Sequence, residues 1–303
     1  MEAIVFEEFG GPEVLHLKEI DEVHAGPGQV RIKVAAAGVN PVDYKIRYGW
    51  MQAAFPTELP ATPGLEVAGT VDEIGEGVTG VAVGDEVLGW SVTGAYAQYA
   101  LAEDFAPKPA GLSWVDAVAL PVAGETAQRV LDLLAVREGE TLLVHGASGA
   151  VGSVAVQLAV ARGAKVVGTA SPAHHEVLRE RGVVPVAYGE GLAGRVREAA
   201  PQGVDAVFEA AGHGDLPALI ETRGGEKDRI VTILDPRAAA EHGVIFSGES
   251  SADRAKGLAG QARLLAEGKL KVQVAEVFPL GDAAKAQQLS EEGHGRGKLV
   301  LKP

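Results

Sequence analysis

The spacing of hydrophobic positions changes about one third of the way along the chain. Up to about residue 110, short alternating or apolar runs are separated by glycine and proline, a pattern typical of strands joined by turns. The expected strands cover residues 29–39, 66–75, 85–90 and 95–102. Ser113 then precedes a helical pattern, and Asp116 three residues later resembles a capping box. We therefore expect a helix to begin after Ser113.

From about residue 139 to 248, apolar strand-like runs alternate with helix-like segments. Strands are expected at 141–145, 165–170, 183–187, 205–210, 229–234 and 244–248, and helices at 150–162, 173–181, 192–199 and 216–222. This alternation predicts a parallel sheet covered on both faces. The tail after residue 248 resumes the strand-and-turn character of the first third, which favours a tail that folds back onto it.

A glycine-rich stretch, HGASGAVG at residues 145–152, lies between the first of these strands and the helix that follows. Backbone N–H groups at a helix N-terminus bind phosphate, and glycine lets a ligand approach the backbone closely. A plain strand-to-helix turn is the alternative, but the surrounding alternation favours dinucleotide binding. We expect the N–H groups from Gly149 to Gly152, preceded by Ser148, to meet a pyrophosphate. A positive φ at Gly149 would add strain to any substitution there.

The next strand indicates which dinucleotide is bound. A fold of this kind that binds NAD places Asp or Glu about 20 residues after the loop. This chain has Ser171, His174 and His175 there, and no carboxylate before Glu176. A hydroxyl and an imidazole suit a 2′-phosphate, so NADPH is the expected cofactor. Alternatively, Ser171 caps the following helix, and either histidine is simply exposed.

Composition narrows the class of protein. With 303 residues we expect two domains, and 47% hydrophobic with 22% charged residues is typical of a globular protein. The net charge of −14 disfavours nucleic acid and anionic membranes as partners. The absence of cysteine excludes disulfides and thiolate-bound zinc. We see no signal peptide and no apolar run long enough for a membrane span, so we expect a cytoplasmic protein.

Several motifs in order resemble the medium-chain dehydrogenase/reductases, in their zinc-free branch of quinone and enone reductases. They include AAGVNPVDYKIRYG, PATPGLEVAGTVDEIGEGV, LPVAGETAQRVL, VHGASGAVG and GHGRGKLVL. The resemblance implies an α/β protein with a Rossmann doubly wound parallel sheet and a discontinuous β-rich GroES-like catalytic domain. We expect the catalytic domain at 1–113 and 249–303, the NADP-binding domain at 114–248, a cleft between them and a homodimer.

The same resemblance bears on metal binding. Asn40 stands where the zinc-dependent branch has a cysteine, and Leu65 stands where it has a histidine. We therefore expect no metal site, and we expect Glu66 to be structural and paired with an arginine. Without a metal, the chemistry that remains is hydride transfer to an acceptor that is already electrophilic, a quinone or an α,β-unsaturated carbonyl.

The resemblance also implies roles for individual residues. Asn40 and Lys45 are expected to face the nicotinamide and the substrate, and Thr126 the nicotinamide carboxamide. Lys45 could stabilise a developing oxyanion or be a solvated lysine, and Tyr44 and Tyr48 are candidate proton donors or walls of the cleft. Further candidates for cofactor contact are Tyr188, Ala211, Gly212, Ile233, Leu234, Phe246, Ser247 and Lys298. Tyr188 and Lys298 could equally be surface residues.

Two other functions stay open at this point. One is an enoyl-thioester reductase, which needs a wide cleft with a basic entrance. The other is an NADPH-binding sensor or interaction protein with little turnover, because no residue stands out as an indispensable catalyst.

Overall fold

The computed structural model describes residues 1–212, 214–293 and 297–303, so the second to fourth residues of the GHGRGKLVL motif lie outside the described residues. The chain forms two compact units, Met1–Val122 with Asp253–Pro303, and Ala123–Ala252. These boundaries differ from the predicted cuts at 113/114 and 248/249. Helix α2 (Trp114–Val118) belongs to the first unit because it packs on that unit's sheet. Residues 249–252 belong to the second, where the Ser251 N–H donates to Glu125 Oε1 at 2.9 Å.

The first unit is built around a six-stranded sheet with the order β13-β14-β3-β4-β5-β6. Its strands are β3 (Val30–Val39), β4 (Glu66–Ile74), β5 (Glu86–Ser91), β6 (Tyr99–Pro107), β13 (Val274–Pro279) and β14 (Lys298–Lys302). A separate hairpin pairs β1 (Glu2–Val5) with β2 (His16–Glu19). The helices of this unit are α1 (Pro41–Arg47), α2, α9 (Arg254–Ala266) and α10 (Ala283–Glu291), with short 3-10 turns η1 (Pro12–Val14) and η3 (Leu280–Asp282).

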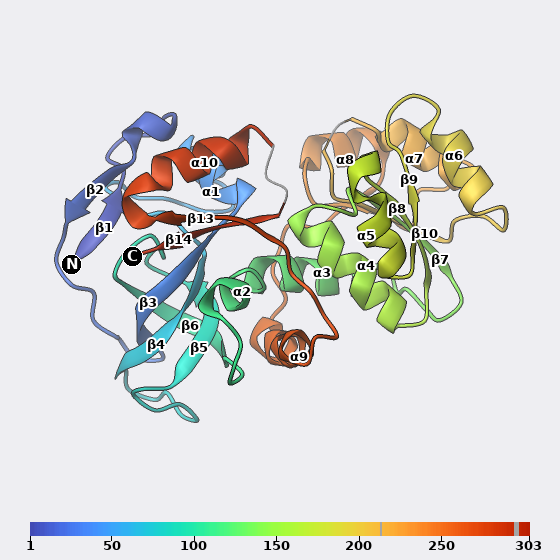
Figure 1. The fold of residues 1–303 in the computed structure, drawn as a ribbon. Coiled ribbons are helices and arrows are strands. Elements are labelled where there is room, and N and C mark those ends of the chain that lie inside the picture. The colour runs from blue at the N-terminus through green and yellow to red at the C-terminus, as the bar shows by residue number, and fades with distance from the viewer. Residues whose placement is uncertain (213, 294–296) are drawn as a thin grey trace. The chain divides into compact units, whose positions relative to one another are not determined.

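Strand β3 closes this sheet on itself, because it pairs with β4 and β14 and also with β6. Its sequence alternates as a half-buried strand should: Val30, Ile32 and Val34 are buried, whereas Lys33 is exposed. The predicted return of the C-terminal tail is confirmed, since β14 lies antiparallel to β3 (Figure 1). The first unit is therefore β-rich, as expected, with its sheet closed on itself through β3.

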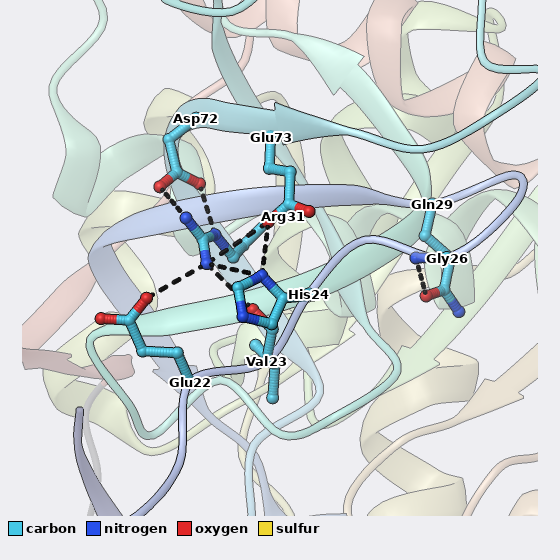
Figure 2. Close-up of polar contacts among 8 residues, drawn as sticks. All are labelled: Glu22, Val23, His24, Gly26, Gln29, Arg31, Asp72 and Glu73. Atoms are coloured by element: carbon cyan, nitrogen blue, oxygen red, sulfur yellow. Dashed lines mark hydrogen bonds and ion pairs between the residues drawn. The ribbon is translucent and has the colours of Figure 1, made fainter.

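Arg31 fastens the segment before β3 to the neighbouring strand (Figure 2). Its guanidinium donates to both Asp72 oxygens, at 3.0 and 2.9 Å, and to the Val23 carbonyl oxygen at 3.1 Å. Glu22 and Glu73 lie within 3.3 Å of the same guanidinium. A planar guanidinium bound by carboxylates on several sides is held in one orientation, so this cluster has a structural role.

The second unit is a parallel sheet with the order β12-β11-β10-β7-β8-β9. Its strands are β7 (Thr141–His145), β8 (Lys165–Thr169), β9 (Val183–Val186), β10 (Ala206–Glu209), β11 (Ile230–Thr232) and β12 (Ile245–Phe246). The helices are α3 (Pro121–Leu133), α4 (Ala150–Ala161), α5 (His175–Glu180), α6 (Leu192–Ala199), α7 (Leu216–Thr222) and α8 (Pro236–His242), with the 3-10 turn η2 (Pro172–His174). The strand order reverses at β7, which defines a doubly wound sheet and puts its switch point beside the glycine loop.

Most predicted elements of the second unit are confirmed, and some in the first are displaced or missed. Strand β7 begins and ends where the apolar run does, because every residue in it is buried. Ser113 caps α2 as expected, accepting from the Asp116 N–H. The strand expected at 95–102 instead covers Tyr99–Pro107. Helices α1 and α8 were not predicted. No helix among the described residues is long and apolar enough to cross a bilayer.

Candidate functional site

The glycine loop between β7 and α4 contains two glycines that the protein's own packing requires. Gly146 has a φ of +86°, a left-handed conformation that favours glycine, and its N–H donates to Thr169 Oγ1 at 2.9 Å. A Cβ at Gly152, in the first turn of α4, would collide with the Gly146 carbonyl oxygen. These two positions therefore explain part of the missing side chains as strand-to-helix packing.

Gly149 is not required for the same reason. Its φ of −72° and ψ of 172° are accessible to any residue, so the strain considered for a positive φ does not arise. A Cβ there would meet only the Gly146 carbonyl oxygen, at 3.4 Å. Packing within the described residues leaves this position open. The absence of a side chain instead keeps the space in front of α4 clear.

The N-terminus of α4 has free hydrogen-bond donors. No side chain caps this 12-residue helix. The N–H groups of Ala150, Val151 and Gly152 find no acceptor among the residues that the structure describes, and Ser153 N–H bonds to the Gly149 carbonyl. Such donors at the positive end of a helix dipole form a site for a phosphate. Ser148, just before Gly149, lies at the same end of the helix.

A hydroxyl and two imidazoles follow the end of β8, at Ser171, His174 and His175. Ser171 precedes the turn η2, but its side chain does not cap it, so the structural alternative for Ser171 is wrong. His175 Nε2 donates to the Ala170 carbonyl oxygen at 3.1 Å. The half-buried His174 side chain makes no hydrogen bond or ion pair within the described part of the chain. Of the two histidines, His174 has the ring nitrogens available to a ligand.

The N–H groups at the end of β10 are already occupied. The buried carboxylate of Glu209 accepts from Ala211 N–H at 2.8 Å and Gly212 N–H at 2.6 Å, and from Thr232 Oγ1 at 2.6 Å. The N–H groups of Ala211 and Gly212 are therefore not available to a ligand. Glu209 fixes the shape of this strand end, a role that the sequence analysis did not assign.

The remaining candidates of the second unit differ in exposure. Ser247 is nearly buried and its Oγ accepts from Arg129, which also donates to Glu125 at 2.8 Å. Thr126, on α3, is nearly buried and its hydroxyl has no partner among the described residues. Tyr188 and Phe246 are exposed, whereas Ile233 and Leu234 are half-buried.

The first unit holds a buried polar cluster around Asn40. Its Nδ2 donates to Glu66 Oε2 at 2.8 Å, and its Oδ1 accepts from Lys298 Nζ at 2.6 Å. Lys298 also forms an ion pair with Glu66, whose other oxygen accepts from the Val122 N–H at 2.6 Å. Glu66 is fully buried and Lys298 is 3% exposed. The expectation of an arginine partner for Glu66 is wrong, because its partner is Lys298 on β14. The alternative of Lys298 as a surface residue is wrong as well.

Asp43, in the first turn of α1, is joined to this cluster through Asn40. Its Oδ2 accepts from the Asn40 N–H at 2.8 Å and from Tyr96 Oη at 2.9 Å. Burial raises the pKa of Asp43 to about 7, although these two bonds and the Lys298 charge act in the opposite direction. Its Oδ1 has no partner among the described residues. Asp43 therefore holds Asn40 in place with a carboxyl group that titrates near neutral pH.

This shift predicts a pH dependence of stability. The pKa of Asp43 rises from 3.8 to about 7 on folding, so the folded protein binds the proton more tightly than the unfolded chain. Asp43 therefore contributes its full stability below about pH 4 and loses it as the pH rises to about 7, by up to about 1.4 kcal/mol per pH unit. Urea unfolding at pH 5 and pH 8 measures the free energy of unfolding. Between these two pH values it should fall more for the parent than for Asp43→Asn. Equal pH dependence in the two proteins would contradict this.

Helix α1 presents the other candidates. Lys45 is half-buried, and its ammonium forms no ion pair with any described carboxylate. Burial and the nearby Glu291 raise the pKa of Tyr44, so its hydroxyl keeps its proton. Tyr48 donates to Glu291 Oε1 at 2.8 Å, and that bond raises its pKa too. Of these three residues, Lys45 has the charge available to a ligand.

Sequence reasoning missed Asp43 and Glu209, although each had a signal. Asp43 follows Asn40 and Pro41 at the spacing of a helix N-terminus, and its carboxylate bonds back to the Asn40 N–H. Glu209 is an acidic residue at the end of an otherwise apolar strand. Arg129 gave no comparable signal, because its partner Ser247 lies far along the chain.

Two family descriptions match the chain. Residues 26–110 match the alcohol dehydrogenase GroES-like domain, and residues 175–301 match the zinc-binding dehydrogenase family. Together with a doubly wound sheet inserted into a closed β-rich unit, these matches define a medium-chain dehydrogenase/reductase. The chain belongs to the quinone oxidoreductase branch of that family.

Three relatives support this assignment. A quinone oxidoreductase of Rattus norvegicus is 35% identical, with 99% of this chain and 97% of the relative covered. An NADPH-dependent alkenal/one oxidoreductase, chloroplastic, of Arabidopsis thaliana is 33% identical, covering 100% of this chain and 80% of the relative. A mycobacterial protein solved in complex with NADPH has a TM-score of 0.86 and 30% identity, with 100% of both chains covered.

Proposed function

We propose that this protein is an NADPH-dependent oxidoreductase that transfers a hydride to a quinone or an α,β-unsaturated carbonyl compound without a metal. The observation that carries the proposal is the uncapped N-terminus of α4, where three N–H groups are free and Gly149 leaves the approach open. In this proposal the second unit binds most of the cofactor, and the first supplies groups to the nicotinamide and the acceptor.

NADPH rather than NADH is proposed from the end of β8. Ser171 and His174 have side chains available for a 2′-phosphate, and the first carboxylate, Glu176, pairs with Arg179 at 3.3 Å. A carboxylate in the place of Ser171 would favour free ribose hydroxyls instead. NADPH also appears in the names of the Arabidopsis relative and of the mycobacterial structure.

We assign cofactor contact to the residues that the sequence analysis indicated, some from the glycine loop and the strand after it and the others from the family resemblance. In the second unit these are Thr126, Ser148, Gly149, Ala150, Val151, Gly152, Ser171, His174, Tyr188, Ala211, Gly212, Ile233, Leu234, Phe246 and Ser247. In the first unit they are Asn40 and Lys45, whereas Lys298, which the sequence analysis also named, positions Asn40. Lys298 acts on Asn40 in this proposal, since its ammonium is bound to the Asn40 amide and to Glu66.

In the proposed reaction the residues of this chain stabilise charge, supply a proton and orient the ligands. NADPH, when bound, supplies the hydride. Lys45 then stabilises the negative charge that develops on the acceptor oxygen, because its ammonium is not committed to a described carboxylate. Tyr44 keeps its proton and is the candidate donor to the reduced acceptor. Asn40 is held by three groups and orients what binds beside it.

The residues present do not fit a catalytic zinc. Asn40 and Leu65 stand where the zinc-dependent branch has metal ligands, and the Glu66 carboxylate is neutralised by Lys298. No group of three His, Cys, Asp or Glu side chains that could hold a metal occurs among the described residues. We therefore derive no step through a metal.

An acceptor panel tests the proposal. We expect steady-state oxidation of NADPH with quinones and enones, a KM for NADPH at least about 10-fold below that for NADH, and the same rate after treatment with EDTA. Turnover with enoyl thioesters alone would indicate the thioester reductase instead. Tight NADPH binding without turnover of any acceptor would indicate a sensor, and loss of activity with EDTA would overturn the metal-free mechanism.

We also propose a homodimer. Strand β12 lies at the edge of the parallel sheet and carries the exposed Phe246, and among the described strands it pairs with β11 alone. An open edge with an apolar side chain is suited to pairing with a second copy. Light scattering should give twice the chain mass of 31.2 kDa. A monomer mass across a wide range of concentrations would refute this.

A further inference from the structure

The turn after α1 carries an aromatic stack with one open face. The Arg47 guanidinium lies 4.8 Å from the centroid of the Tyr48 ring. On the Tyr48 ring stacks Trp50, with ring centroids 4.5 Å apart and an angle of 10° between the planes. Arg47 is fully buried, whereas Trp50 is 65% exposed. The stack therefore runs from the interior of the first unit to its surface.

Hydrogen bonds hold the side chains of Arg47 and Tyr48 in place and fix the backbone of Trp50. Arg47 Nη1 donates to Gln287 Oε1 at 2.7 Å and its Nε to the Gly10 carbonyl oxygen at 3.0 Å. Tyr48 Oη donates to Glu291. The backbone N–H of Trp50 donates to the Lys45 carbonyl oxygen at 3.0 Å, which fixes the start of the turn against α1. The indole is thus a supported surface rather than a loose side chain.

Burying an aromatic ring is favourable, so a ligand that covered the open face of Trp50 would gain affinity. The inner face of Trp50 is covered by Tyr48, and the ring is electron-rich. The same helix end carries Lys45, whose ammonium has no described partner. A flat electron-poor ring with a carbonyl oxygen matches both features, since the ring can stack on indole and the oxygen can meet the ammonium.

We propose that Trp50 determines acceptor specificity: its open face stacks on the conjugated ring of a quinone or aryl enone, with Lys45 directed at the ring's carbonyl oxygen. The inference rests on the proposed function, because it names the acceptor that the same reaction prefers. Acyclic enones offer no ring to Trp50 and gain only the Lys45 interaction.

The experiment compares 1,4-naphthoquinone with 3-buten-2-one in the parent and in Trp50→Leu. We expect the ratio of kcat/KM for naphthoquinone over butenone to fall about 3- to 10-fold, mainly through the KM for naphthoquinone, which is the range of one aromatic stack. Trp50→Phe should restore most of the ratio. Trp114→Leu is the matched control, because Trp114 lies on α2 beside Lys108, and its ratio should equal that of the parent. Circular dichroism verifies that each variant is folded.

An unchanged ratio in Trp50→Leu would overturn the inference while leaving the proposed function standing. If the parent turned over no acceptor, the proposed function would fail, and binding would decide the role of Trp50 alone. Saturable quenching of tryptophan emission by naphthoquinone should then occur in the parent and in Trp114→Phe, and be lost in Trp50→Phe. Equal saturable quenching in all three proteins would also overturn the inference.

Discussion

Replacing Gly149 by valine is expected to weaken NADPH binding by at least about 100-fold, or roughly 3 kcal/mol, while the protein stays folded. The branched side chain would project into the space in front of the free N–H groups of Ala150 to Gly152. Within the described residues it meets only one carbonyl oxygen, at 3.4 Å, and its φ is unstrained. The cost to folding should be limited to about 1 kcal/mol for a poor helix N-cap.

Calorimetry with NADPH measures the affinity, and thermal unfolding without cofactor measures the fold. Gly194→Val is the matched control, because Gly194 lies in α6 with nothing within 4 Å of an added Cβ. Its affinity for NADPH should equal that of the parent. If folded Gly149→Val bound NADPH like the parent, the loop would be only a strand-to-helix turn.

Lys298→Met is expected to lower the free energy of unfolding by about 3–5 kcal/mol, because it leaves the fully buried Glu66 without its counter-charge. Asn40 Nδ2 and the Val122 N–H would still donate to Glu66, but neither neutralises it. Urea unfolding measures the effect.

The double variant Glu66→Gln with Lys298→Met separates lost charge pairing from lost packing. It should be more stable than Lys298→Met alone, since no unpaired charge remains buried. A single variant as stable as the parent would show that the pair contributes nothing to folding. If the double variant were no more stable than Lys298→Met, the lost stability would come from packing rather than from the unpaired charge.

The parallel sheet could be predicted from the sequence because its signal is local. Residues 141–145 form a continuous apolar run that is buried along its whole length, and the glycine loop follows at once. Ser113 likewise caps α2 through a bond to a residue three positions away. Where adjacent residues determine the structure, composition and spacing predict the element.

The polar cluster could not be predicted in the same way. Asn40, Glu66 and Lys298 come from three distant segments, and only the pairing of β14 with β3 brings Lys298 to the other two. The resemblance therefore supplied the right carboxylate and the wrong partner. Helix α1 was missed because its start depends on the Asp43 bond to the Asn40 N–H, which the spacing of hydrophobic positions does not show. The predicted bounds of β6 were displaced because the apolar run that predicts this strand begins before the strand does.

The transfer of label from the cofactor to the acceptor tests the central claim most directly. NADPH carrying deuterium at the transferable C4 position is incubated with the protein and 3-buten-2-one, and the product is analysed by mass spectrometry and NMR. The account predicts saturated ketone with one deuterium at the β-carbon, formed at the same rate with EDTA present. Saturated ketone without deuterium would contradict it, and so would the absence of NADPH oxidation with both this enone and the quinones of the panel.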